Sequence, residues 1–354
     1  MPDLNVLTRY DCDRDQLAAL LDDQPTYRVD QAWHGLYQLR CEPDDMTSLP
    51  MALREQLTHQ LPLALAVAAR STSDEGATIK WLWTCGDGSQ IETVLMHYDD
   101  RSTVCVSTQS GCAMGCRFCA TGQAGYGRNL SVGEIVEQVI HAQQQAGADH
   151  RRVSNVVFMG MGEPLANFDQ LDAAVRRLHG DLGLSARHLT ISTVGLVPGI
   201  DRLAHSDLPV NLAVSLHAAN DTLRDELVPI NRRYPLATLE AACVRYLDAK
   251  GRRLSFEWAL IDGVNDQPRD AAELADIAYR LRAHVNLIPL NPTPGYLTQG
   301  TPRRGVVDFR DALRERGVRA TVRQNRGTDI DAACGQLRAT AEAAPVALRR
   351  SRPT

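Results

Sequence analysis

The sequence lacks the features that place a protein in or across a membrane. Its longest apolar stretch, Leu61 to Ala69, is far shorter than the roughly 20 residues of a transmembrane helix. Its acidic beginning, Met1 to Gln16, has neither the basic nor the apolar segment of a signal peptide. Fixed-period repeats and low-complexity tracts are also absent. We therefore expect a cytoplasmic protein that has no membrane partner.

The composition also lacks the extremes that define disordered or nucleic-acid-binding chains. Hydrophobic residues make up 44% and charged residues 23% of the 354 residues, which is typical of a folded protein and excludes general disorder. The formal net charge is −5, and residues 1–98 carry 7 basic against 15 acidic side chains. Because no segment is strongly basic, composition alone gives no argument for an RNA partner.

Cysteine is the residue type that calls for an explanation. There are nine cysteines, an odd number in a chain without an export signal, so a disulfide framework explains them poorly. Metal binding or redox chemistry is the better interpretation. Four of the nine, Cys12, Cys41, Cys85 and Cys243, belong to no motif and are interpreted as structural thiols.

The sequence pattern divides the chain into four regions. Short amphipathic stretches predict a small helical N-terminal domain over residues 1–75, and two β-prone runs around the turn Gly86–Ser89 predict a β-hairpin extension over residues 76–100. Residues 101–340 alternate between strand-like and helix-like stretches, and residues 341–354 are a basic C-terminal tail. The alternation predicts an α/β fold, a complete or partial (β/α) barrel, in which ligands bind at the carboxyl ends of the strands.

The expected elements of the barrel are defined by their periodicity. The predicted strands are 103–108, 155–159, 189–192, 211–216, 254–261, 285–290 and 320–322. The predicted helices between them include 132–145, 171–178, 236–249, 271–282 and 305–316. The residues that directly follow each strand are therefore the first candidates for chemistry.

Three cysteines follow the first barrel strand in the spacing C-x3-C-x2-C: Cys112, Cys116 and Cys119. A structural zinc site is the simplest alternative, but such a site uses four ligands in closely spaced pairs, and no second pair lies nearby in the sequence. Three thiolates suit a [4Fe–4S] cluster with one iron left open. The spacing therefore favours an iron–sulfur cluster whose open iron binds a substrate or cofactor.

The cysteine segment, with Phe118 before its last cysteine, resembles the radical S-adenosylmethionine (SAM) enzymes. Further motifs resemble one family among them, the RlmN/Cfr methyltransferases of adenosine in RNA, and the resemblance covers residues from about 90 to 340. These motifs are Cys105 to Ser107, Gly111 to Cys116, Phe118 to Gly122, Arg128 to Leu130, Glu134-Ile135, Met161 to Leu165, Ser215 to Ala218, Leu287 to Pro292 and Asp329 to Leu337. The resemblance implies a partial α/β barrel of the radical SAM type.

The resemblance also implies the cofactors. Cys112, Cys116 and Cys119 match the ligands of a [4Fe–4S] cluster, and the open iron of that cluster binds SAM, which is cleaved to a 5′-deoxyadenosyl radical after electron delivery. Two SAM molecules are consumed per turnover, and the electron comes from a donor such as flavodoxin or ferredoxin. A radical route suits carbon 2 of adenine because its aromatic C–H has no useful acidity, so the difficult chemistry lies in the cofactors.

Two cysteines and one carboxylate receive catalytic roles from the resemblance. Cys334 matches the cysteine that is first methylated and then, after loss of a hydrogen atom, adds to the adenine. Cys105 matches the resolving cysteine, which releases the product by forming a disulfide bond with Cys334. Glu92 matches a carboxylate proposed to remove the adenine C2 proton. Without the resemblance, Cys105 is a buried strand thiol and Glu92 a solvated strand carboxylate.

Residues that match the family's SAM contacts lie at the ends of successive predicted strands. They are Gly162, Glu163, Ser192, Ser215, Leu216, His217 and Asn291. From spacing alone, Gly162-Glu163 is equally well a plain turn, and His217 is more often a core histidine. Their placement at strand ends favours a shared ligand site.

One residue bears on the regiochemistry of the predicted reaction. Pro164 follows Gly162-Glu163, as in RlmN-type members, which methylate carbon 2, whereas Cfr-type members methylate carbon 8 and resemble Gly-Glu-Ala there. The resemblance implies adenosine 2503 of 23S rRNA as the substrate and, in some members, adenosine 37 of tRNA. We expect a monomeric radical SAM methyltransferase of RNA adenosine.

Two other functions stay open. A Cfr-type C8 methyltransferase, or a radical SAM paralogue with another RNA substrate, would keep the cluster and change the product. A non-catalytic zinc-binding RNA module would be colourless and indifferent to SAM. Arginine pairs such as Arg232-Arg233 and Arg252-Arg253 offer phosphate contacts, but paired arginines are usually part of a solvated face.

Overall fold

The computed structural model describes residues 7–293 and 295–337. A ten-stranded sheet with the order β1-β2-β3-β4-β7-β8-β9-β10-β11-β12 forms its centre, and β5 and β6 form a separate two-stranded ribbon. The strands are β1 (Leu65–Ser73), β2 (Thr78–Cys85), β3 (Gln90–His97), β4 (Ser102–Cys105), β5 (Gln109–Gly111), β6 (Tyr126–Asn129), β7 (Val153–Phe158), β8 (Leu189–Thr193), β9 (Asn211–Ser215), β10 (Leu254–Leu260), β11 (His284–Pro289) and β12 (Ala320–Val322). The predicted basic tail, residues 341–354, lies outside the described residues.

Local signals in the sequence explain where the helices begin and end. Ser131 caps α5 by accepting a hydrogen bond from the backbone N–H of Glu134, whose side chain accepts one from the backbone of Ser131 in return. Pro268 begins α10, and Gly251 ends α9 in the left-handed conformation. The α-helices of the described residues are α1 (Arg14–Leu20), α2 (Tyr27–His34), α3 (Met51–Gln60), α4 (Ala120–Ala124), α5 (Val132–Ala148), α6 (Phe168–Gly180), α7 (Val197–His205), α8 (Asp221–Leu227), α9 (Leu236–Lys250), α10 (Pro268–Arg280) and α11 (Arg303–Glu315).

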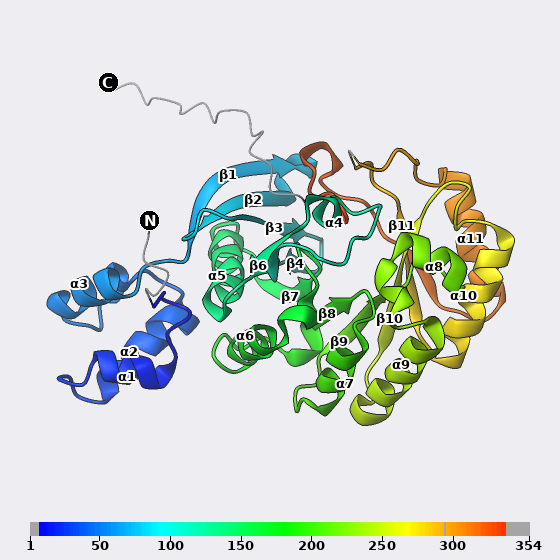
Figure 1. Cartoon of the computed structure of the whole chain (residues 1–354). Helices are drawn as coiled ribbons and strands as arrows, with labels where there is room; N and C mark the ends of the chain where they lie inside the picture. Colours follow the sequence, from blue (N-terminus) through cyan, green and yellow to red (C-terminus); the bar gives the residue numbers. More distant parts are fainter. Residues whose placement is uncertain (1–6, 294, 338–354) are drawn as a thin grey trace, which may run out of the picture.

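β4 and the strands from β7 to β12 build the predicted barrel. Each pairs in parallel with the next in the order of the sheet. Within the described residues β12 pairs only with β11, so the barrel is partial and open. Figure 1 shows the helices from α6 to α11 following one another around the curved sheet. The α/β prediction is thereby confirmed, although β4 ends at Cys105 and not at Thr108 as expected.

An antiparallel extension continues the sheet on the side of β4. The predicted hairpin is formed by β2 and β3, with the backbone N–H of Cys85 donating to Ser89 O at 2.8 Å. β1 lies within the region that the sequence pattern predicts to be helical, and it pairs antiparallel with β2. Most of β1 is exposed or half-buried, so its side chains lack the apolar pattern that reveals a strand.

The N-terminal helices pack against the amino-terminal end of α5 and the end of α6. Asp11, ahead of α1, accepts hydrogen bonds from the backbone N–H of Gly133 at 2.7 Å and from Ser131 Oγ at 3.1 Å. Trp33 in α2 donates its indole N–H to Asp181 Oδ1 at 2.9 Å, just beyond α6. These contacts fix the segment of α1 to α3 beside the barrel, as Figure 1 shows at the lower left.

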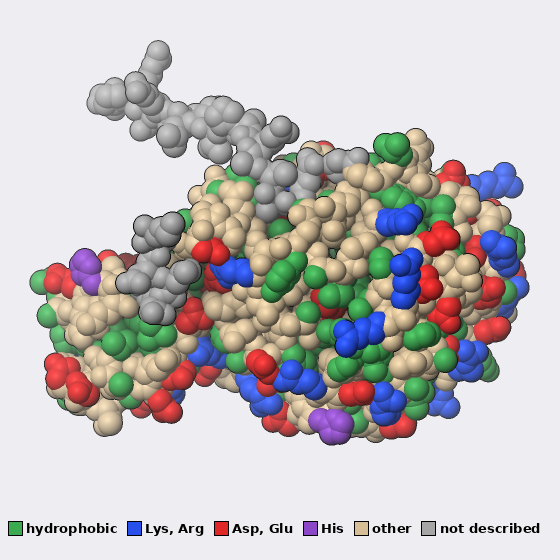
Figure 2. Space-filling model, in the orientation of Figure 1, with side chains coloured by type: hydrophobic (Ala, Val, Ile, Leu, Met, Phe, Trp, Pro, Cys, Tyr) green, Lys and Arg blue, Asp and Glu red, His purple; other side chains and the backbone are tan. Residues whose placement is uncertain are grey.

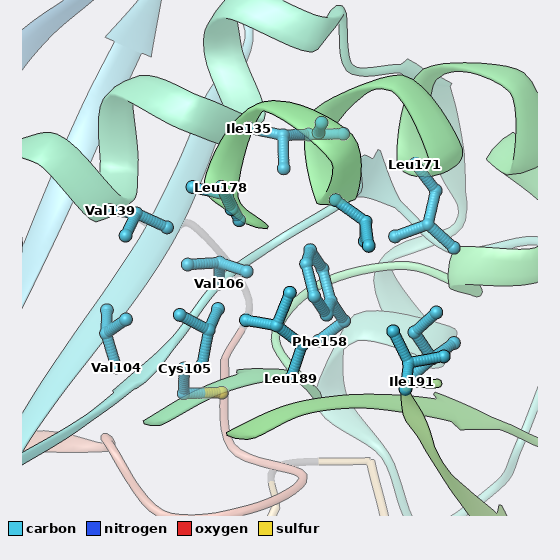
Figure 3. Packing of buried hydrophobic residues seen from close by; sticks show 14 of the residues in the cluster. Val104, Cys105, Val106, Ile135, Val139, Phe158, Leu171, Leu178, Leu189 and Ile191 are labelled. Atoms are coloured by element: carbon cyan, nitrogen blue, oxygen red, sulfur yellow. The ribbon is translucent and has the colours of Figure 1, made fainter. Parts of the chain in front are cut away.

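The main hydrophobic core lies between the sheet and its outer helices. Ile135 and Val139 of α5 face Val106 and Phe158, and each of the four is essentially inaccessible to solvent. Figure 3 shows this packing, with Cys105 at its edge and the Cys105 sulfur turned away from α5. The core therefore fixes β4 and β7 in place and leaves their carboxyl ends free to carry functional groups.

The surface carries both signs of charge. In the view of Figure 2, basic side chains are spread over the barrel among acidic ones, and acidic side chains border the segment of α1 to α3. Arg128, which belongs to a matched motif, is engaged by Asp87 at 2.5 Å and by Glu134 at 2.6 Å. None of the helices in residues 7–293 and 295–337 is long and apolar enough to cross a membrane.

Candidate active site

A cavity with an empty volume of about 1000 Å³, its mouth included, opens at the carboxyl ends of the barrel strands. Its lining brings together ten of the residues that the sequence predicts for the site. They are Cys112, Cys116, Cys119, Gly162, Glu163, Ser192, Ser215, His217, Asn291 and Cys334. Three residues that the sequence does not predict, Met159, Glu257 and Arg323, complete the inner part of the lining.

The ribbon of β5 and β6 shapes the loop that carries the three cluster cysteines. The backbone N–H of Cys112 donates to Gly125 O at 2.7 Å. Gly111 has a φ of 80°, and a Cβ there would lie 2.1 Å from Gly125 O, so only glycine fits. At the other end of the loop, the N–H of Ala120 donates to Gly335 O at 2.8 Å. This bond brings the cysteine loop next to the residue that follows Cys334.

The three thiols lie close enough to interact electrostatically. Burial, with smaller contributions from the charges of Glu163 and Cys119, raises the pKa of Cys112 to about 12. Burial and the charges of Cys119 and Cys112 raise the pKa of Cys116 well above 9. Bound iron would hold them as thiolates by supplying positive charge. In the part of the chain that the structure describes, no three His, Cys, Asp or Glu side chains converge as ligands of one metal ion. The ligands of a [4Fe–4S] cluster bind different irons and do not have to converge on one point. The three cysteines share one loop and line one cavity, which matches such a set of ligands.

Gly162 and Glu163 form the predicted cavity wall after β7. Gly162 has a φ of 104°, and a Cβ there would lie 2.6 Å from Gln109 Cβ. Glu163 is buried, and its carboxylate accepts hydrogen bonds from the backbone N–H groups of Val194 at 2.9 Å and Leu165 at 3.1 Å. Burial raises the pKa of Glu163 to about 7, although these hydrogen bonds lower it. The pair is thus a built polar wall and more than a simple turn.

Polar groups from β8, β9 and the segment after β9 line the next part of the cavity. The hydroxyl oxygens of Ser192 and Ser215 lie 3.4 Å apart. His217 accepts a hydrogen bond from the backbone N–H of Ala259 on Nδ1 at 3.0 Å, so its proton lies on Nε2. Burial lowers the pKa of His217 to about 3, and its ring packs edge-on against Phe118. His217 is therefore a neutral side chain that is buried in the protein and also contributes a polar group to the cavity lining.

Leu216 and Arg224 differ from the sequence prediction. Leu216, expected among the SAM contacts, is 1% exposed, packs in the main core and does not line the cavity. Arg224, which no sequence motif marks, is fully buried and donates to the carbonyl oxygens of Leu216 at 3.1 Å and Val194 at 2.7 Å. Arg224 thus ties the ends of β8 and β9 together. One arginine among 36 carries no sequence signal for such a role.

Asn291 and Cys334 are joined directly. The Asn291 side-chain amide donates to the backbone carbonyl of Cys334 at 3.0 Å, and its oxygen accepts from Asn325 Nδ2 at 2.7 Å. Cys334 is exposed toward the cavity. The residue is accessible, but protein atoms surround its sulfur, and this desolvation raises the pKa of the thiol. The charge of Arg323 lowers that pKa. Asn291, expected to contact SAM, therefore also positions the loop of Cys334.

Cys105 and Glu92 lie outside the cavity lining. Cys105 ends β4, and its thiol pKa is raised to about 12 by burial and by the charge of Cys334, which places the two sulfurs within electrostatic range. Glu92 on β3 is 4% exposed and pairs with Lys80 Nζ at 2.8 Å. The interpretation of Glu92 as a solvated carboxylate is therefore wrong. Lys80 also donates to Asp331 O at 3.3 Å, which connects Glu92 to the loop of Cys334.

Comparison with known proteins agrees with this geometry. Residues 106–275 match the model of the radical SAM superfamily. The chain is 53% identical over 340 residues to a "Probable dual-specificity RNA methyltransferase RlmN" of Frankia alni, covering 92% of this chain and 81% of that protein. A protein of Chloroflexus aurantiacus with the same description is 50% identical, covering 93% of this chain and 92% of that one.

A solved structure extends the similarity to three dimensions. The crystal structure of a radical SAM methyltransferase from Sphaerobacter thermophilus superposes with a TM-score of 0.91 at 50% identity, covering 94% of this chain and 100% of that chain. A [4Fe–4S] cluster and SAM are the cofactors of such enzymes, in agreement with the three-cysteine loop and the polar cavity. The chain belongs to the RlmN family of radical SAM RNA methyltransferases.

Proposed function

We propose that the protein methylates carbon 2 of adenosine in RNA, with Cys334 as the methyl-carrying residue and Cys105 as the resolving residue. Adenosine 2503 of 23S rRNA is the principal substrate, and adenosine 37 of tRNA is a second one. The observation that carries the proposal is the placement of Cys334 in one cavity with Cys112, Cys116 and Cys119. The proposed substrates agree with the names of the RlmN relatives, which describe a dual-specificity RNA methyltransferase.

The site provides distinct roles for its own residues. Cys112, Cys116 and Cys119 would hold the cluster, which supplies the radical chemistry of bound SAM. The polar wall of Glu163 and His217 would orient SAM in the cavity, with Glu163 as acceptor and His217 Nε2–H as donor. Cys334 is accessible from this cavity, as a methyl acceptor must be.

The proposed release step uses the second cysteine. The Cys105 thiol loses its proton, and its sulfur attacks the Cys334 sulfur to form a disulfide bond. The bond between Cys334 and the transferred carbon breaks, and its electron pair stays with the RNA, where that carbon takes up a proton to become the methyl group. The electrostatic interaction between the two thiols supports this role. Glu92 is proposed as the base that takes the C2 proton. Its salt-bridge partner Lys80 also donates a hydrogen bond to Asp331 O in the loop of Cys334, so Glu92 is connected to that loop.

Carbon 2 is preferred over carbon 8 because Pro164 follows Gly162-Glu163, as in RlmN-type sequences. We further propose that the protein acts as a cytoplasmic monomer that receives electrons from a flavodoxin- or ferredoxin-like donor. The target adenine has to leave its stack to reach a cavity at the strand ends, as enzymes that modify bases require.

The proposal is tested by anaerobic reconstitution. The protein is loaded with iron and sulfide, and 23S rRNA is mapped by mass spectrometry after addition of SAM and a reducing system. The expected result is 2-methyladenosine at position 2503. An 8-methyladenosine product would overturn the assigned carbon, and SAM cleavage without any methylated rRNA would overturn the proposed substrate.

A further inference from the structure

A second cavity opens at the amino-terminal end of the barrel, opposite to the active site. It has an empty volume of about 1270 Å³, its mouth included. Its lining contains Asn211 and His284, the first residues of β9 and β11, and reaches inward to Glu257 and Arg323, which also line the active-site cavity. The described residues of this lining include none of the predicted site residues, so the proposed reaction assigns the second cavity no function.

The lining of the second cavity is basic. Its described residues include four arginines and two histidines but a single carboxylate, that of Glu257. Arg323 balances the charge of Glu257, because its Nε atom lies 3.4 Å from Glu257 Oε2. The other three arginines, Arg187, Arg252 and Arg253, form no ion pair within residues 7–293 and 295–337. The cavity therefore carries an excess of positive charge, which attracts anions.

The three unpaired arginines come from two segments that the fold brings together. Arg187 lies in the short helix before β8, and Arg252 and Arg253 lie between α9 and β10. β8 and β10 are the two neighbours of β9 in the sheet. Because these strands run parallel, the segments before β8 and β10 lie at the same end of the barrel. Arginines 65 residues apart in the sequence therefore line one cavity.

Asn211 connects the two segments by hydrogen bonds. Arg252 donates from Nη2 to Asn211 Oδ1 at 3.1 Å, and the Asn211 amide donates to the backbone carbonyl of Arg187 at 2.7 Å. The Nε atom of Arg252 is shielded from solvent and has no hydrogen-bond partner among the described residues. Buried donors without a partner are rare in folded proteins, so this nitrogen indicates an acceptor that the chain itself does not supply.

We propose that the second cavity is a binding site for a phosphate group, held by Arg187, Arg252 and Arg253. Guanidinium groups bind phosphate oxygens through paired N–H donors, and the positive charge of the lining suits a dianion. Thr190 and His284 add a hydroxyl group and an imidazole ring to the lining. The phosphate belongs to a small phosphate ester or to the RNA backbone, and the experiments below distinguish these sources. The inference does not depend on the chemistry proposed for the active site.

A solvated arginine cluster without a ligand makes a different prediction. Paired arginines usually belong to a solvated face, and in that case the pair Arg252-Arg253 would bind phosphate no better than any other pair. Arg303-Arg304 on α11 offers the comparison, because both residues are exposed and lie outside both cavities. The double variants Arg252→Gln/Arg253→Gln and Arg303→Gln/Arg304→Gln remove the same charge from the protein. A difference between them therefore reports on the cavity and not on net charge.

The first measurement is a calorimetric titration with inorganic phosphate. Cluster-loaded, full-length protein is titrated at constant ionic strength, with chloride as the balancing anion. We expect saturable binding to the natural protein and binding about tenfold weaker or more in Arg252→Gln/Arg253→Gln, since charge-assisted hydrogen bonds are lost. Arg303→Gln/Arg304→Gln should bind phosphate like the natural protein. The absence of saturable binding to the natural protein, or equal affinity in the two double variants, would overturn the inference.

A second variant covers the case in which Arg252→Gln/Arg253→Gln does not fold. Arg187 is exposed, and its side chain forms no hydrogen bond within the described residues, so Arg187→Gln removes a cation without removing a structural contact. This variant should bind phosphate about tenfold more weakly while its unfolding temperature stays that of the natural protein. An unchanged phosphate affinity in folded Arg187→Gln would contradict the proposed site.

The second measurement identifies the source of the phosphate. Binding of a labelled 23S rRNA fragment is followed at several salt concentrations for both double variants. If the RNA backbone supplies the phosphate, Arg252→Gln/Arg253→Gln should bind RNA more weakly and lower the salt dependence by about one phosphate contact relative to Arg303→Gln/Arg304→Gln. If phosphate binding is lost while RNA binding equals that of the control, the ligand is a small phosphate ester.

Discussion

The side-chain amide of Asn291 holds the backbone carbonyl of Cys334 at 3.0 Å. Asn291 lies just after β11, and Cys334 lies in the segment after β12, so this single bond connects the wall of the barrel to the loop that carries the proposed methyl acceptor. The side-chain amide of Asn325 donates a hydrogen bond to Asn291 Oδ1 at 2.7 Å. The position of Cys334 therefore depends on a short chain of amide hydrogen bonds.

Substitution of Asn291 should loosen the Cys334 loop. Asn291→Ala removes the donor to Cys334, and Asn291→Asp keeps the size of the side chain while replacing the donor with an acceptor. We expect both variants to methylate Cys334 about 5- to 150-fold more slowly, since a lost buried hydrogen bond costs about 1–3 kcal/mol. Mass spectrometry of Cys334 after reaction with SAM measures the effect. An Asn291→Asp variant that methylates Cys334 at the natural rate would show that the bond has no such function.

A second prediction concerns Gly162, where both the backbone conformation and the close approach of Gln109 require glycine. Its φ is 104°, and an added Cβ would lie 2.6 Å from Gln109 Cβ, whose side chain binds the backbone of Glu163 at 2.8 Å. Gly162→Ala should displace Glu163, weaken SAM binding about tenfold or more and destabilise the fold by about 1–3 kcal/mol.

Gly147→Ala is the matched control for this change. Gly147 lies in α5, has no neighbour within 4 Å of an added Cβ and needs no positive φ. Alanine there should leave SAM binding unchanged and stabilise the protein slightly, because it lowers the entropy of the unfolded chain. Calorimetric SAM titration and thermal unfolding measure both variants, and equal SAM affinity in the two would contradict the role of Gly162.

Much of the barrel was predictable because its signals are local. β12 has the predicted bounds, Ala320–Val322, and α9 begins at the predicted Leu236 and ends one residue beyond the predicted end. These elements were predictable because periodicity and turn residues are properties of short segments. The three-cysteine spacing was also readable, because its ligands lie within one loop. β1 was not, because a mostly exposed edge strand is defined by its partner β2 and not by its own sequence.

The residues that sequence reasoning missed depend on distant parts of the chain. Glu92 lies opposite Leu82 in the register of β2 and β3, which places Lys80 diagonally beside it on the same face. The sequence around Glu92 does not predict that salt bridge, because its partner Lys80 lies on another strand. Arg224 and Arg323 are likewise ordinary arginines in a sequence with 36 of them. Only burial and the surrounding acceptors distinguish them from solvated residues.

A third prediction is a dependence of stability on pH through Glu137. This residue of α5 accepts hydrogen bonds from the backbone N–H groups of Ala64 at 2.9 Å and Leu65 at 3.0 Å. Burial raises the pKa of Glu137 from 4.5 to about 7, although the two hydrogen bonds lower it. Because the pKa is higher in the folded state, the stabilising contribution is complete below the unfolded value and is lost as pH rises through about 7.

Glu137→Gln tests this dependence, since the amide cannot ionise. Near pH 5 the variant should be less stable by about 1 kcal/mol, because glutamine offers one acceptor oxygen to two donors. Near pH 8.5 the difference should shrink or reverse, because the natural protein then carries a desolvated charge. Urea unfolding at both pH values measures the difference, with exposed Glu55→Gln as the control. A difference that stays constant or widens toward high pH would exclude this role of Glu137.

The last prediction separates methyl loading from product release. Cys105 is buried outside the cavity lining, and its thiol interacts with that of Cys334. Cys105→Ala should therefore leave methylation of Cys334 intact and stop the reaction at a covalent adduct between protein and RNA, because no second sulfur attacks the Cys334 sulfur. A denaturing gel with labelled RNA, followed by mass spectrometry of the adduct, detects this species.

Cys243→Ala is the matched control for Cys105→Ala. Cys243 is also buried, in α9, and lies outside the cavity, so its replacement removes a buried thiol without touching either proposed thiol. The control should release product normally and show no adduct. Release of free methylated RNA by Cys105→Ala at the rate of Cys243→Ala would refute the resolving role. An adduct that forms in Cys105→Ala and is absent from the double variant Cys105→Ala/Cys334→Ala would place the covalent bond at Cys334.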